Sequence, residues 1–243
     1  MKTKNKILII IPARGGSKGI PEKNIRNFLG KPLIAYSILA AKKSNFENRT
    51  IVSTDNKKIS NIAKKFGAES PFLRPKSISK DNSTAIDYVE HSLNFLQKEN
   101  YVPDIIVILQ PTSPIRNSTI IDQSINQLIQ QKSDSVITVS KASPHPYWAM
   151  KLNPKKFLKP INDNFSKFNC RQKLPELYYP NGSVFAFWKK NLAKHKSILG
   201  KKISHIVLKD EESIDIDTPF DLFVAQMTLK YWNSFSKKFV DKN

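Results

Sequence analysis

The chain has 243 residues and a mass of 27.7 kDa, a size that one large α/β domain commonly reaches. Lysine and arginine exceed aspartate and glutamate by 40 − 20 = 20 charges, and 40% of the residues are hydrophobic. This apolar content excludes a disordered chain. The single cysteine, Cys170, excludes an intramolecular disulfide and a cysteine-cluster metal site.

The net charge of +20 would suit a nucleic-acid-binding protein. The lysines are spread through every segment, however, and no basic block exceeds two residues. We therefore expect no nucleic-acid partner. No apolar run approaches the roughly 18 residues of a membrane span, and Ile7–Ile11 is too short for a signal-peptide core. The expectation is a soluble, reduced, cytoplasmic protein without a membrane partner.

Short apolar runs alternate along the first half of the chain with segments of helical periodicity. In order, these predict a strand at 7–12, helices at 33–41, 59–66 and 86–96 with a strand at 51–53 between the first two, and a strand at 105–109. A helix at 121–129 with Ser118 as its cap and a strand at 135–139 follow. Gly67 is predicted to end the second helix. This alternation predicts right-handed βαβ units and a mostly parallel sheet.

The pattern breaks at residues 141–179, which are rich in proline, lysine, asparagine and aromatic residues. We interpret about 141–180 as an insert in a single domain that spans 1–243. Strands are predicted again at 183–188 and 203–208. Thr218 and Pro219 predict the start of a last helix, since threonine caps helix amides and proline suits the first turn. Residues 236–243 are expected to form a polar tail.

The loop after the first predicted strand concentrates small and positively charged residues. They are Arg14, Gly15, Gly16, Ser17, Lys18, Gly19, Lys23 and Asn24. Glycine lets a backbone approach a ligand with its amides exposed, and cations beside such amides suit a polyphosphate. Neither a P-loop nor a dinucleotide-binding fingerprint is present. The alternative is a plain glycine turn with solvated lysines.

This loop resembles the signature of the acylneuraminate (sialic acid) cytidylyltransferases, a family that includes enzymes for legionaminic and pseudaminic acid. Four further stretches match in the same order, and these are Leu73–Pro75, Gln110–Arg116, Pro180–Gly182 and Ser213–Thr218. The resemblance spans about residues 7–230. It implies transfer of CMP from CTP to the anomeric hydroxyl of a sialic-acid-like nonulosonic acid, for cell-surface polysaccharide synthesis.

The same resemblance implies a three-layer, doubly wound fold of the nucleotide-diphospho-sugar transferase type. It also implies Mg²⁺ as cofactor and a homodimer, with the insert at about 141–180 as the dimerisation element. Arg14 and Lys23 would neutralise charge on the phosphates, and Asp217 would help to remove the proton of the attacking hydroxyl. Together with Arg14 and Lys18, the residues Gly15, Gly16, Ser17 and Asn24 would bind the nucleotide.

The resemblance implies that Arg74 and the loop at 79–84 hold the cytosine and its ribose. Arg74 can donate hydrogen bonds to the O2 and N3 acceptors of cytosine. Asp81 and Ser83 belong to the same nucleotide-binding set. From the residues alone, Asp81 to Thr84 simply cap the helix that begins near Ala85, and both interpretations can hold.

The resemblance assigns the sugar acid to Gln110, Arg171 and Asn181. The Gln110 amide both donates and accepts hydrogen bonds, which suits a sugar hydroxyl or acyl group. For Arg116 the alternative to a role in the site is a structural one, in which it pairs with a carboxylate below its loop. Tyr179 is a departure, because many family members carry arginine immediately before Pro-Asn-Gly. The positive charge of that arginine is either lost here or supplied by Arg171 or a lysine. The nonulosonic acid is therefore not identified.

Two acidic residues alternate with isoleucines shortly before the last helix. In an extended segment Asp215 and Asp217 face the same side, whereas Ile214 and Ile216 face the core. Like charges so placed repel unless a cation joins them, and Mg²⁺ prefers one or two carboxylates plus phosphate oxygens. The resemblance assigns the metal to this pair. Nothing basic lies within three residues of either aspartate, and the alternative is that Asp217 only precedes the cap at Thr218.

Two rival functions remain. One is another sugar-acid nucleotidyltransferase, of the type that activates the eight-carbon acid Kdo, which the glycine loop and the aspartate pair fit less well. The other is a non-catalytic basic protein that binds nucleic acid. It predicts an affinity that falls steeply with salt and no turnover of CTP.

Overall fold

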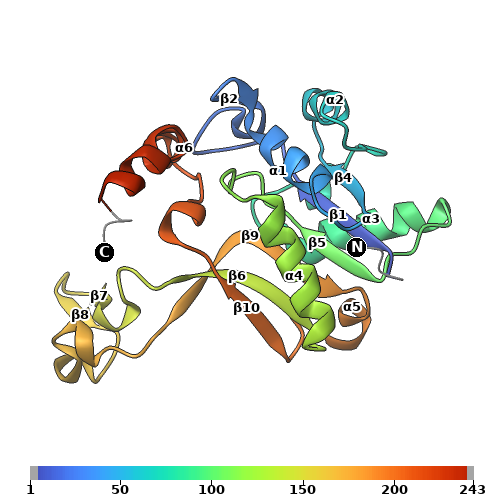
Figure 1. Ribbon diagram of the computed structural model, residues 1–243. Coiled ribbons are helices and arrows are strands. Elements are labelled where there is room, and N and C mark those ends of the chain that lie inside the picture. The colour runs from blue at the N-terminus through green and yellow to red at the C-terminus, as the bar shows by residue number, and fades with distance from the viewer. Residues whose placement is uncertain (1–4, 240–243) are drawn as a thin grey trace.

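A six-stranded sheet with the order β10-β6-β9-β5-β1-β4 forms the centre of the structure (Figure 1), a computed structural model that describes residues 5–239. Its strands are β1 (Ile7–Pro12), β4 (Arg49–Ser53), β5 (Ile105–Ile108), β6 (Ser135–Lys141), β9 (Tyr178–Trp188) and β10 (Ile203–Val207). β1 is parallel to β4 and β5, and β10 is parallel to β6. Only β9 runs antiparallel to its neighbours in this sheet. The predicted mostly parallel sheet is confirmed.

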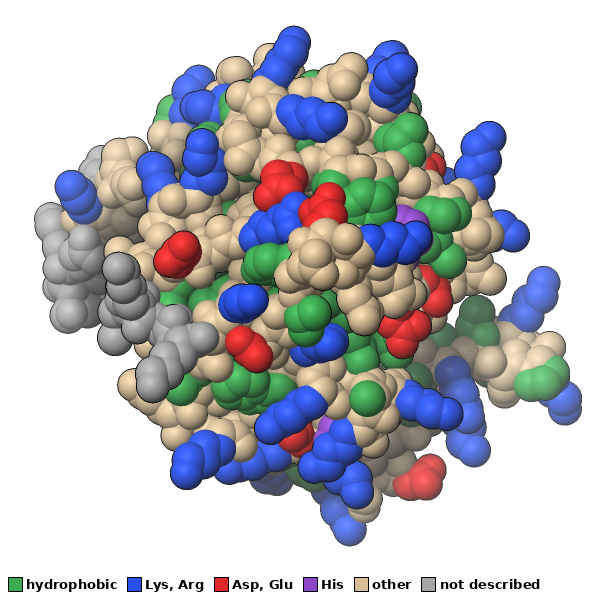
Figure 2. All heavy atoms as spheres, turned by 90° about the vertical axis from the view of Figure 1, so that its right-hand side faces the viewer, with side chains coloured by type: hydrophobic (Ala, Val, Ile, Leu, Met, Phe, Trp, Pro, Cys, Tyr) green, Lys and Arg blue, Asp and Glu red, His purple; other side chains and the backbone are tan. Residues whose placement is uncertain are grey.

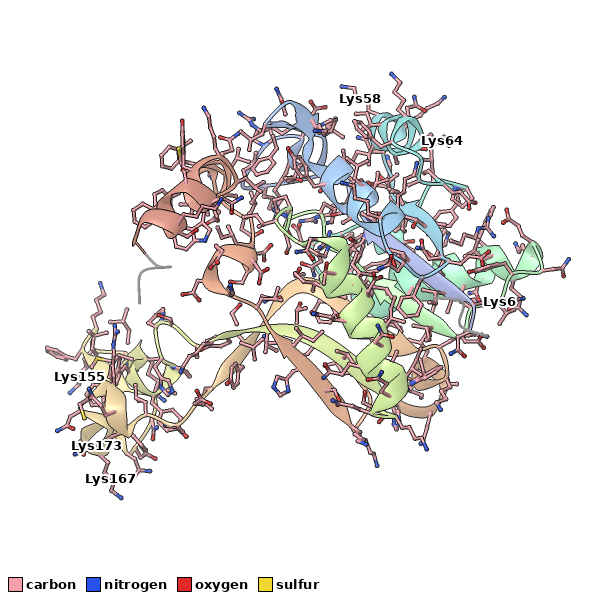
Figure 3. The ribbon with its side chains drawn as sticks, viewed as in Figure 1. Lys6, Lys58, Lys64, Lys155, Lys167 and Lys173 are labelled. Carbon is pink, nitrogen blue, oxygen red and sulfur yellow. The ribbon has the colours of Figure 1, made fainter. Side chains whose placement is uncertain are left out.

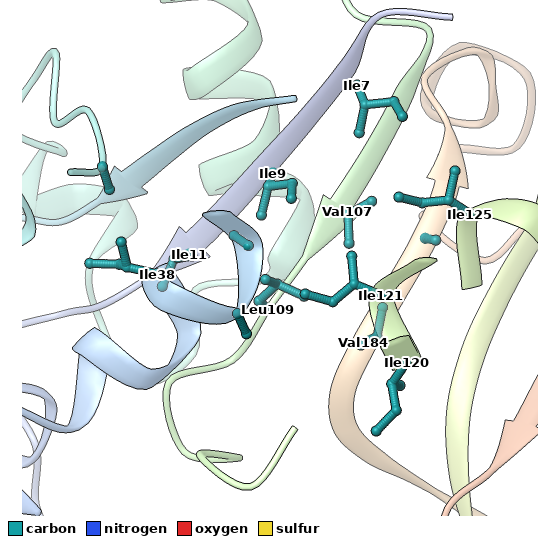
Figure 4. Close-up of a cluster of buried hydrophobic side chains, with 14 of the residues drawn as sticks. Ile7, Ile9, Ile11, Ile38, Val107, Leu109, Ile120, Ile121, Ile125 and Val184 are labelled. Carbon is teal, nitrogen blue, oxygen red and sulfur yellow. The ribbon is translucent and has the colours of Figure 1, made fainter. Parts of the chain in front are cut away.

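Helices cover both faces of the sheet and complete the three predicted layers. They are α1 (Leu33–Lys42), α2 (Lys57–Lys65), α3 (Ala85–Lys98), α4 (Ser118–Gln130) and α5 (Lys190–His195). A last helix, α6 (Pro219–Phe239), packs on a separate small core. Ile7, Ile9 and Ile11 of β1 pack with α1, α2 and α4 on one face (Figure 4). Leu8 and Ile10 pack with α3 and α5 on the other. β1 is apolar throughout because successive side chains enter opposite cores.

Most of the other predicted bounds shift by one to three residues, and three differences have a clear structural cause. Asn117, not Ser118, caps α4, and its side chain accepts a hydrogen bond from the Ile120 amide at 3.1 Å. β9 begins at Tyr178, because residues before the apolar run already pair with β6. The expected polar tail is wrong for residues 236–239, which continue α6, while 240–243 lie outside the described residues.

The segment between β6 and β9 forms an arm that projects from the sheet (Figure 1). Within it, β7 (Met150–Leu152) and β8 (Leu158–Pro160) pair as an antiparallel hairpin. Large apolar side chains of this hairpin are exposed, among them Leu152, Phe157 and Leu158. The arm coincides with the insert expected at about 141–180, and its role in dimerisation stays a prediction.

α6 starts where the sequence places it. The Thr218 hydroxyl accepts a hydrogen bond from the Asp221 amide at 3.2 Å, and the Asp221 carboxylate accepts from the Thr218 amide at 2.7 Å. Leu222 and Ala225 attach the helix to a small core around Phe28, next to the hairpin of β2 (Asn27–Phe28) and β3 (Lys31–Pro32). None of the helices within residues 5–239 combines the length and apolar character that a bilayer crossing requires.

Candidate active site

A cleft of about 410 Å³ opens where the parallel strands β1 and β5 end. Ligands of open α/β sheets bind at such carboxyl ends. On the loop after β1 its lining residues include Arg14, Ser17, Lys18, Lys23 and Asn24. Elsewhere its lining includes Arg74, Asp81, Ser83, Gln110 and Asp217. Folding therefore gathers in one cleft most of the site residues predicted from segments far apart in the sequence.

Two glycines of the loop after β1 occupy positions where a side chain has no room. A Cβ atom on Gly15 would lie 2.7 Å from the side-chain nitrogen of Asn56. A Cβ on Gly19 would collide with the carbonyl oxygen of Asp217. The Gly15 amide donates to the Asp55 carboxylate at 2.8 Å. The loop is thus pressed against the end of β4 on one side and the acidic segment before α6 on the other, whereas Gly16 has open space around it.

Asn24 braces the same loop from within. Its side chain is 6% exposed and donates a hydrogen bond to the Arg14 carbonyl at 2.9 Å. This bond fixes the backbone from which the Arg14 side chain extends into the cleft. A buried amide that meets a backbone carbonyl is also a stable local structure, so Asn24 shapes the nucleotide loop whether or not it touches the ligand.

Asp81 joins two cations of the loop. Its carboxylate forms ion pairs with Arg14 and, at 2.5 Å, with Lys18 Nζ. These contacts hold the pKa of the Asp81 carboxyl below its usual range, with Lys18 as the larger influence and Arg14 next. The sequence predicted that Asp81 binds the nucleotide. In the structure it lines the cleft and pairs with two of the cations that the resemblance assigns to the nucleotide, so its own role in nucleotide binding stays a prediction.

Lys23 reaches across the cleft to the acidic segment. Its Nζ atom lies 2.9 Å from Asp217 Oδ1 and donates to the Ile216 carbonyl at 2.8 Å. The Lys23 side chain is 15% exposed, whereas that of Asp217 is 73% exposed. No basic residue lies within three positions of either aspartate in the sequence. In the structure the basic partner of Asp217 is Lys23, which comes from the loop after β1.

The charge of Asp217 acts on Asp215, as expected for two carboxylates on one side. Asp215 keeps exposed surface, but the protein around it displaces enough water to raise its pKa, and the charge of Asp217 raises it further. A hydrogen bond with Thr112 acts in the opposite direction. A divalent cation would relieve this repulsion.

The aspartate pair therefore suits the small number of carboxylates that Mg²⁺ takes when substrate phosphate completes its shell. Within residues 5–239 no cluster of three histidine, cysteine, aspartate or glutamate side chains is assembled for a metal. Asp217 also precedes the cap of α6, and its amide donates to Asp221 at 3.1 Å. A position at the start of α6 and a role in metal binding are thus compatible for Asp217.

Arg74 forms the wall at the other end of the cleft. It is 6% exposed, and its Nε atom donates to the Ser79 hydroxyl at 3.1 Å. Its guanidinium carbon lies 5.7 Å from the centre of the Tyr88 ring, within cation–π range. Burial lowers its pKa. Tyr88 also lines the cleft, but its position on α3 follows the apolar spacing of an ordinary core residue, so the sequence alone does not indicate it.

The helix-cap alternative for the loop at 79–84 is correct in part. Thr84 caps α3, since its hydroxyl accepts from the Asp87 amide and the Asp87 carboxylate accepts from the Thr84 amide. Ser83 closes the preceding turn by accepting from the Lys80 amide at 3.0 Å. Asp81 takes no part in the cap. Its carboxylate instead forms ion pairs with Arg14 and Lys18 of the glycine loop.

The Gln110 side chain lies against Gly182 of β9. A Cβ on Gly182 would lie 2.5 Å from Gln110 Oε1, and Gly182 has a φ of +74°, which glycine adopts readily. The Asn181 side chain is 9% exposed, accepts from the Thr138 hydroxyl at 2.7 Å and donates to Ser140 at 3.0 Å. Asn181 therefore ties β9 to β6 and does not line the cleft.

The structure bears on the expectations for two arginines. Arg116 pairs with no carboxylate among residues 5–239, and instead donates to the carbonyls of Gln110 and Ser183. Arg171 lies in the insert and lines a separate cavity of about 620 Å³, not the cleft. Tyr179, the departure from the family pattern, lies in β9 opposite Ser140 of β6 and is 49% exposed.

Cations on one wall of the cleft and carboxylates on another suit a nucleoside triphosphate, which defines a nucleotide-binding α/β protein of the transferase type. The sequence model of the family described as Cytidylyltransferase matches residues 8–227, and the chain belongs to this family. The predicted family membership is thereby confirmed.

Two curated relatives match nearly full length. The chain is 35% identical to CMP-N,N'-diacetyllegionaminic acid synthase of Legionella pneumophila, with 93% of this chain and 97% of the relative covered. It is 34% identical to pseudaminic acid cytidylyltransferase of Campylobacter jejuni, with the same coverage of 93% and 97%. A solved structure of CMP:2-keto-3-deoxy-manno-octonic acid synthetase complexed with CTP aligns with a TM-score of 0.67 at 15% identity, over 93% of this chain and 98% of that one. This last likeness confirms the fold alone.

Proposed function

We propose that the protein transfers CMP from CTP to the anomeric hydroxyl of a sialic-acid-like nonulosonic acid and releases pyrophosphate. Family membership and the names of the two relatives support this reaction. The observation that carries the proposal is the contact between Lys23 and Asp217, which brings the glycine loop and the acidic segment to one cleft. A triphosphate, a metal and an acceptor hydroxyl all have to meet at such a point.

Arg74 provides the basis for choosing CTP. Its Nε atom is bound to Ser79, so the rest of the buried guanidinium is left to donate toward the cleft. Cytosine offers acceptors at both O2 and N3, whereas uracil presents an N–H donor at position 3. Two facing donors repel, and each donor left buried without an acceptor costs about 1–3 kcal/mol.

The phosphates would lie along the loop after β1. Arg14, Lys18 and Lys23 all line the cleft there, and the anomeric hydroxyl would attack the α-phosphorus in line. Cations placed beforehand around a transferring phosphoryl group stabilise the charge that develops in the transition state. Binding of CTP would have to release Arg14 and Lys18 from Asp81.

Mg²⁺ is proposed as the cofactor, and Asp215 and Asp217 would hold it. When bound, it would neutralise part of the triphosphate charge. Lys23 keeps Asp217 beside the loop, which makes Asp217 the candidate to accept the proton of the attacking hydroxyl. The mutual repulsion of the two aspartates supports a cation at this place.

A homodimer is proposed on the basis of the arm. The hairpin of the insert exposes a group of large apolar side chains, and such patches are usually covered by a partner. Arg171 lines a cavity of the arm and not the cleft of its own chain. If it contacts the sugar acid, we propose that it does so in the cleft of a second copy.

The rival functions receive less support. On the face that Figure 2 shows, lysines and arginines lie apart, with acidic groups among them. The lysines labelled in Figure 3 lie in three separate places, which are Lys6 before β1, Lys58 and Lys64 on α2, and Lys155, Lys167 and Lys173 on the arm. A nucleic-acid-binding face would concentrate them. For the Kdo-type alternative, the likeness to the solved synthetase is one of fold.

The direct test is pyrophosphate release from each of the four nucleoside triphosphates, with and without Mg²⁺. Legionaminic, pseudaminic and N-acetylneuraminic acids serve as acceptors, with Kdo as the competing substrate. We expect turnover with CTP and at least one nine-carbon acid. Equal rates with UTP would remove the role given to Arg74, and turnover with Kdo alone would establish the rival enzyme.

A further inference from the structure

Arg116 is a buried cation without a counter-ion. It is 3% exposed, in the loop that connects β5 to α4. Among residues 5–239 no charged group offsets its loss of hydration, and burial alone lowers its pKa to about 9. A charge removed from water without a partner is strongly unfavourable. A neutral side chain of similar volume would avoid this cost, so the retained charge calls for an explanation.

The guanidinium connects three parts of the fold through neutral acceptors. It donates to the Gln110 carbonyl at 3.2 Å and to the Ser183 carbonyl at 2.7 Å, and also to the Ser37 hydroxyl. These acceptors belong to the end of β5, to β9 and to α1. Nε has no partner within the described chain. Arg116 therefore fixes the main chain at a junction rather than forming an ion pair.

This junction determines where the Gln110 side chain lies. Gln110 lines the cleft, and its Oε1 atom lies against Gly182. Arg116 holds the carbonyl of Gln110 on one side of that contact and the carbonyl of Ser183, the next residue after Gly182, on the other. A shift of either strand end would move the Gln110 amide.

The position also fits the charge of the acceptor. Arg74 occupies the base end of the cleft, and the cations beside the glycine loop are needed by the phosphates. This leaves the end of the cleft at Gln110 for the acceptor. Among the described lining residues, every lysine and arginine is already assigned to the base or to the phosphates, except Lys80 on the loop at 79–84. A nonulosonic acid brings a carboxylate there. The charge of Arg116 beneath this end is buried, so salt screens it weakly.

We propose that Arg116 is a positioning residue for the acidic acceptor: it holds Gln110 against Gly182, and its unpaired charge favours an acceptor that carries a carboxylate. This inference rests on the proposed reaction for its substrate. Its geometric part can be measured without any substrate.

The kinetic test compares Arg116→Met and Arg116→Lys with wild type. Loss of hydrogen bonds from a charged donor predicts a rise of about ten- to a hundredfold in KM for the sugar acid with Arg116→Met. KM for CTP should stay within about twofold. Arg116→Lys keeps the charge but cannot bridge both carbonyls, so its KM for the acid should lie between the other two. If the methionine variant fails to fold, the lysine variant still has to show this rise.

Arg49 offers the matched control. It is also partly buried and forms ion pairs with Glu69 and Glu99, both at 2.6 Å, but at the start of β4, away from the cleft. Arg49→Met should lower the melting temperature and leave both KM values unchanged. If Arg116→Met behaves like Arg49→Met, Arg116 is a structural arginine and the inference is wrong.

A second readout separates this inference from the proposed reaction. The side-chain amide resonances of Gln110, assigned by comparison with Gln110→Ala, should be those of a held amide in wild type and shift toward those of a free amide in Arg116→Met. The variant that combines Gln110→Ala with Arg116→Met should raise KM for the sugar acid by about as much as the more severe of the two single variants. If wild type turns over no nonulosonic acid, the proposed reaction fails, and the Gln110 resonances still decide the positioning role. Unchanged resonances in Arg116→Met would overturn it.

Discussion

Lys23 and Asp217 lie 194 positions apart in the chain, yet Lys23 Nζ is 2.9 Å from Asp217 Oδ1. The pair joins the glycine loop that follows the first strand to the acidic segment that precedes the last helix. One member was predicted to bind phosphate and the other a metal. In the structure each of these groups neutralises the other, and in the proposed reaction a nucleotide and a cation would take over these partners.

Lys23→Ala should reduce kcat/KM by about 10²-fold or more, which corresponds to about 2–4 kcal/mol of transition-state stabilisation. The fold should lose no more than about 1 kcal/mol, because an ion pair to the exposed Asp217 contributes little to stability. Pyrophosphate release and thermal melts measure the two effects. Lys58→Ala is the control, since Lys58 pairs with Glu22 of the same loop at 3.2 Å but does not line the cleft. Equal activity of both variants would make Lys23 an ordinary surface lysine.

Asp217→Asn keeps the size of the side chain and removes its charge. We expect the Mg²⁺ concentration for half-maximal activity to rise and turnover to fall by roughly 10²-fold or more, if Asp217 also accepts the proton. The fold should be preserved because the side chain is 73% exposed. The measurement is the Mg²⁺ dependence of pyrophosphate release beside a thermal melt. An early melt combined with wild-type Mg²⁺ dependence would place the metal elsewhere and leave Asp217 as a helix-end residue.

Asp81→Asn should tighten CTP binding by a few-fold at low salt. Asp81 occupies Arg14 and Lys18, and the triphosphate has to displace it from both. Calorimetric titration of CTP at two salt concentrations measures the effect, which should shrink as salt screens these exposed pairs. Glu22→Gln is the control, because Glu22 is an acidic residue on the loop after β1 whose partner is Lys58 and not Arg14 or Lys18. Weaker CTP binding by the Asp81 variant would restore Asp81 to the groups that contact the nucleotide.

The sequence predicted the six strands of the main sheet and the helices α1 to α4 and α6, because these have local signals, whereas α5 and the two short hairpins were not predicted. β1 is a continuous apolar run since it is buried on both faces, and Gly67 ends α2 with a φ of +88°. The early start of β9 has no such signal. Its first residues include two exposed tyrosines and a proline, and they become a strand because β6 offers a pairing edge. Tertiary context of this kind overrides local propensity.

In the candidate site, too, some features have a local sequence signal and others depend on tertiary contacts. The glycine loop could be identified from its own composition, and the side of the sheet on which it lies follows from the parallel topology. The partners of its side chains could not, because Asp81 and Asp217 lie on separate loops. Asp55 could have been noticed, since it follows a strand that ends at the same edge. Tyr88 carries the spacing of a core residue, and only the position of Arg74 distinguishes it.

Asp215→Asn should make the protein more stable at neutral pH. Loss of hydration raises the pKa of the Asp215 carboxyl in the folded state, and the charge of Asp217 adds to the shift. Between the ordinary value of 3.8 and the raised value, the folded state binds more protons than the unfolded state. Stability from this group therefore falls as pH rises through that window, and the ionised carboxylate is a cost at neutral pH.

The asparagine variant stays uncharged at every pH, so it should melt above wild type at about pH 7 and approach it as the pH falls below the ordinary aspartate value. Mg²⁺ should raise the melting temperature of wild type more than that of the variant, because a bound cation relieves the same repulsion. Melts over a range of pH, with and without Mg²⁺, measure both effects. Asp210→Asn, which changes an acidic residue outside the cleft, is the control. A variant that melts below wild type at neutral pH would mean that Asp215 is held as a favourable ion partner, and that the two aspartates need no cation between them.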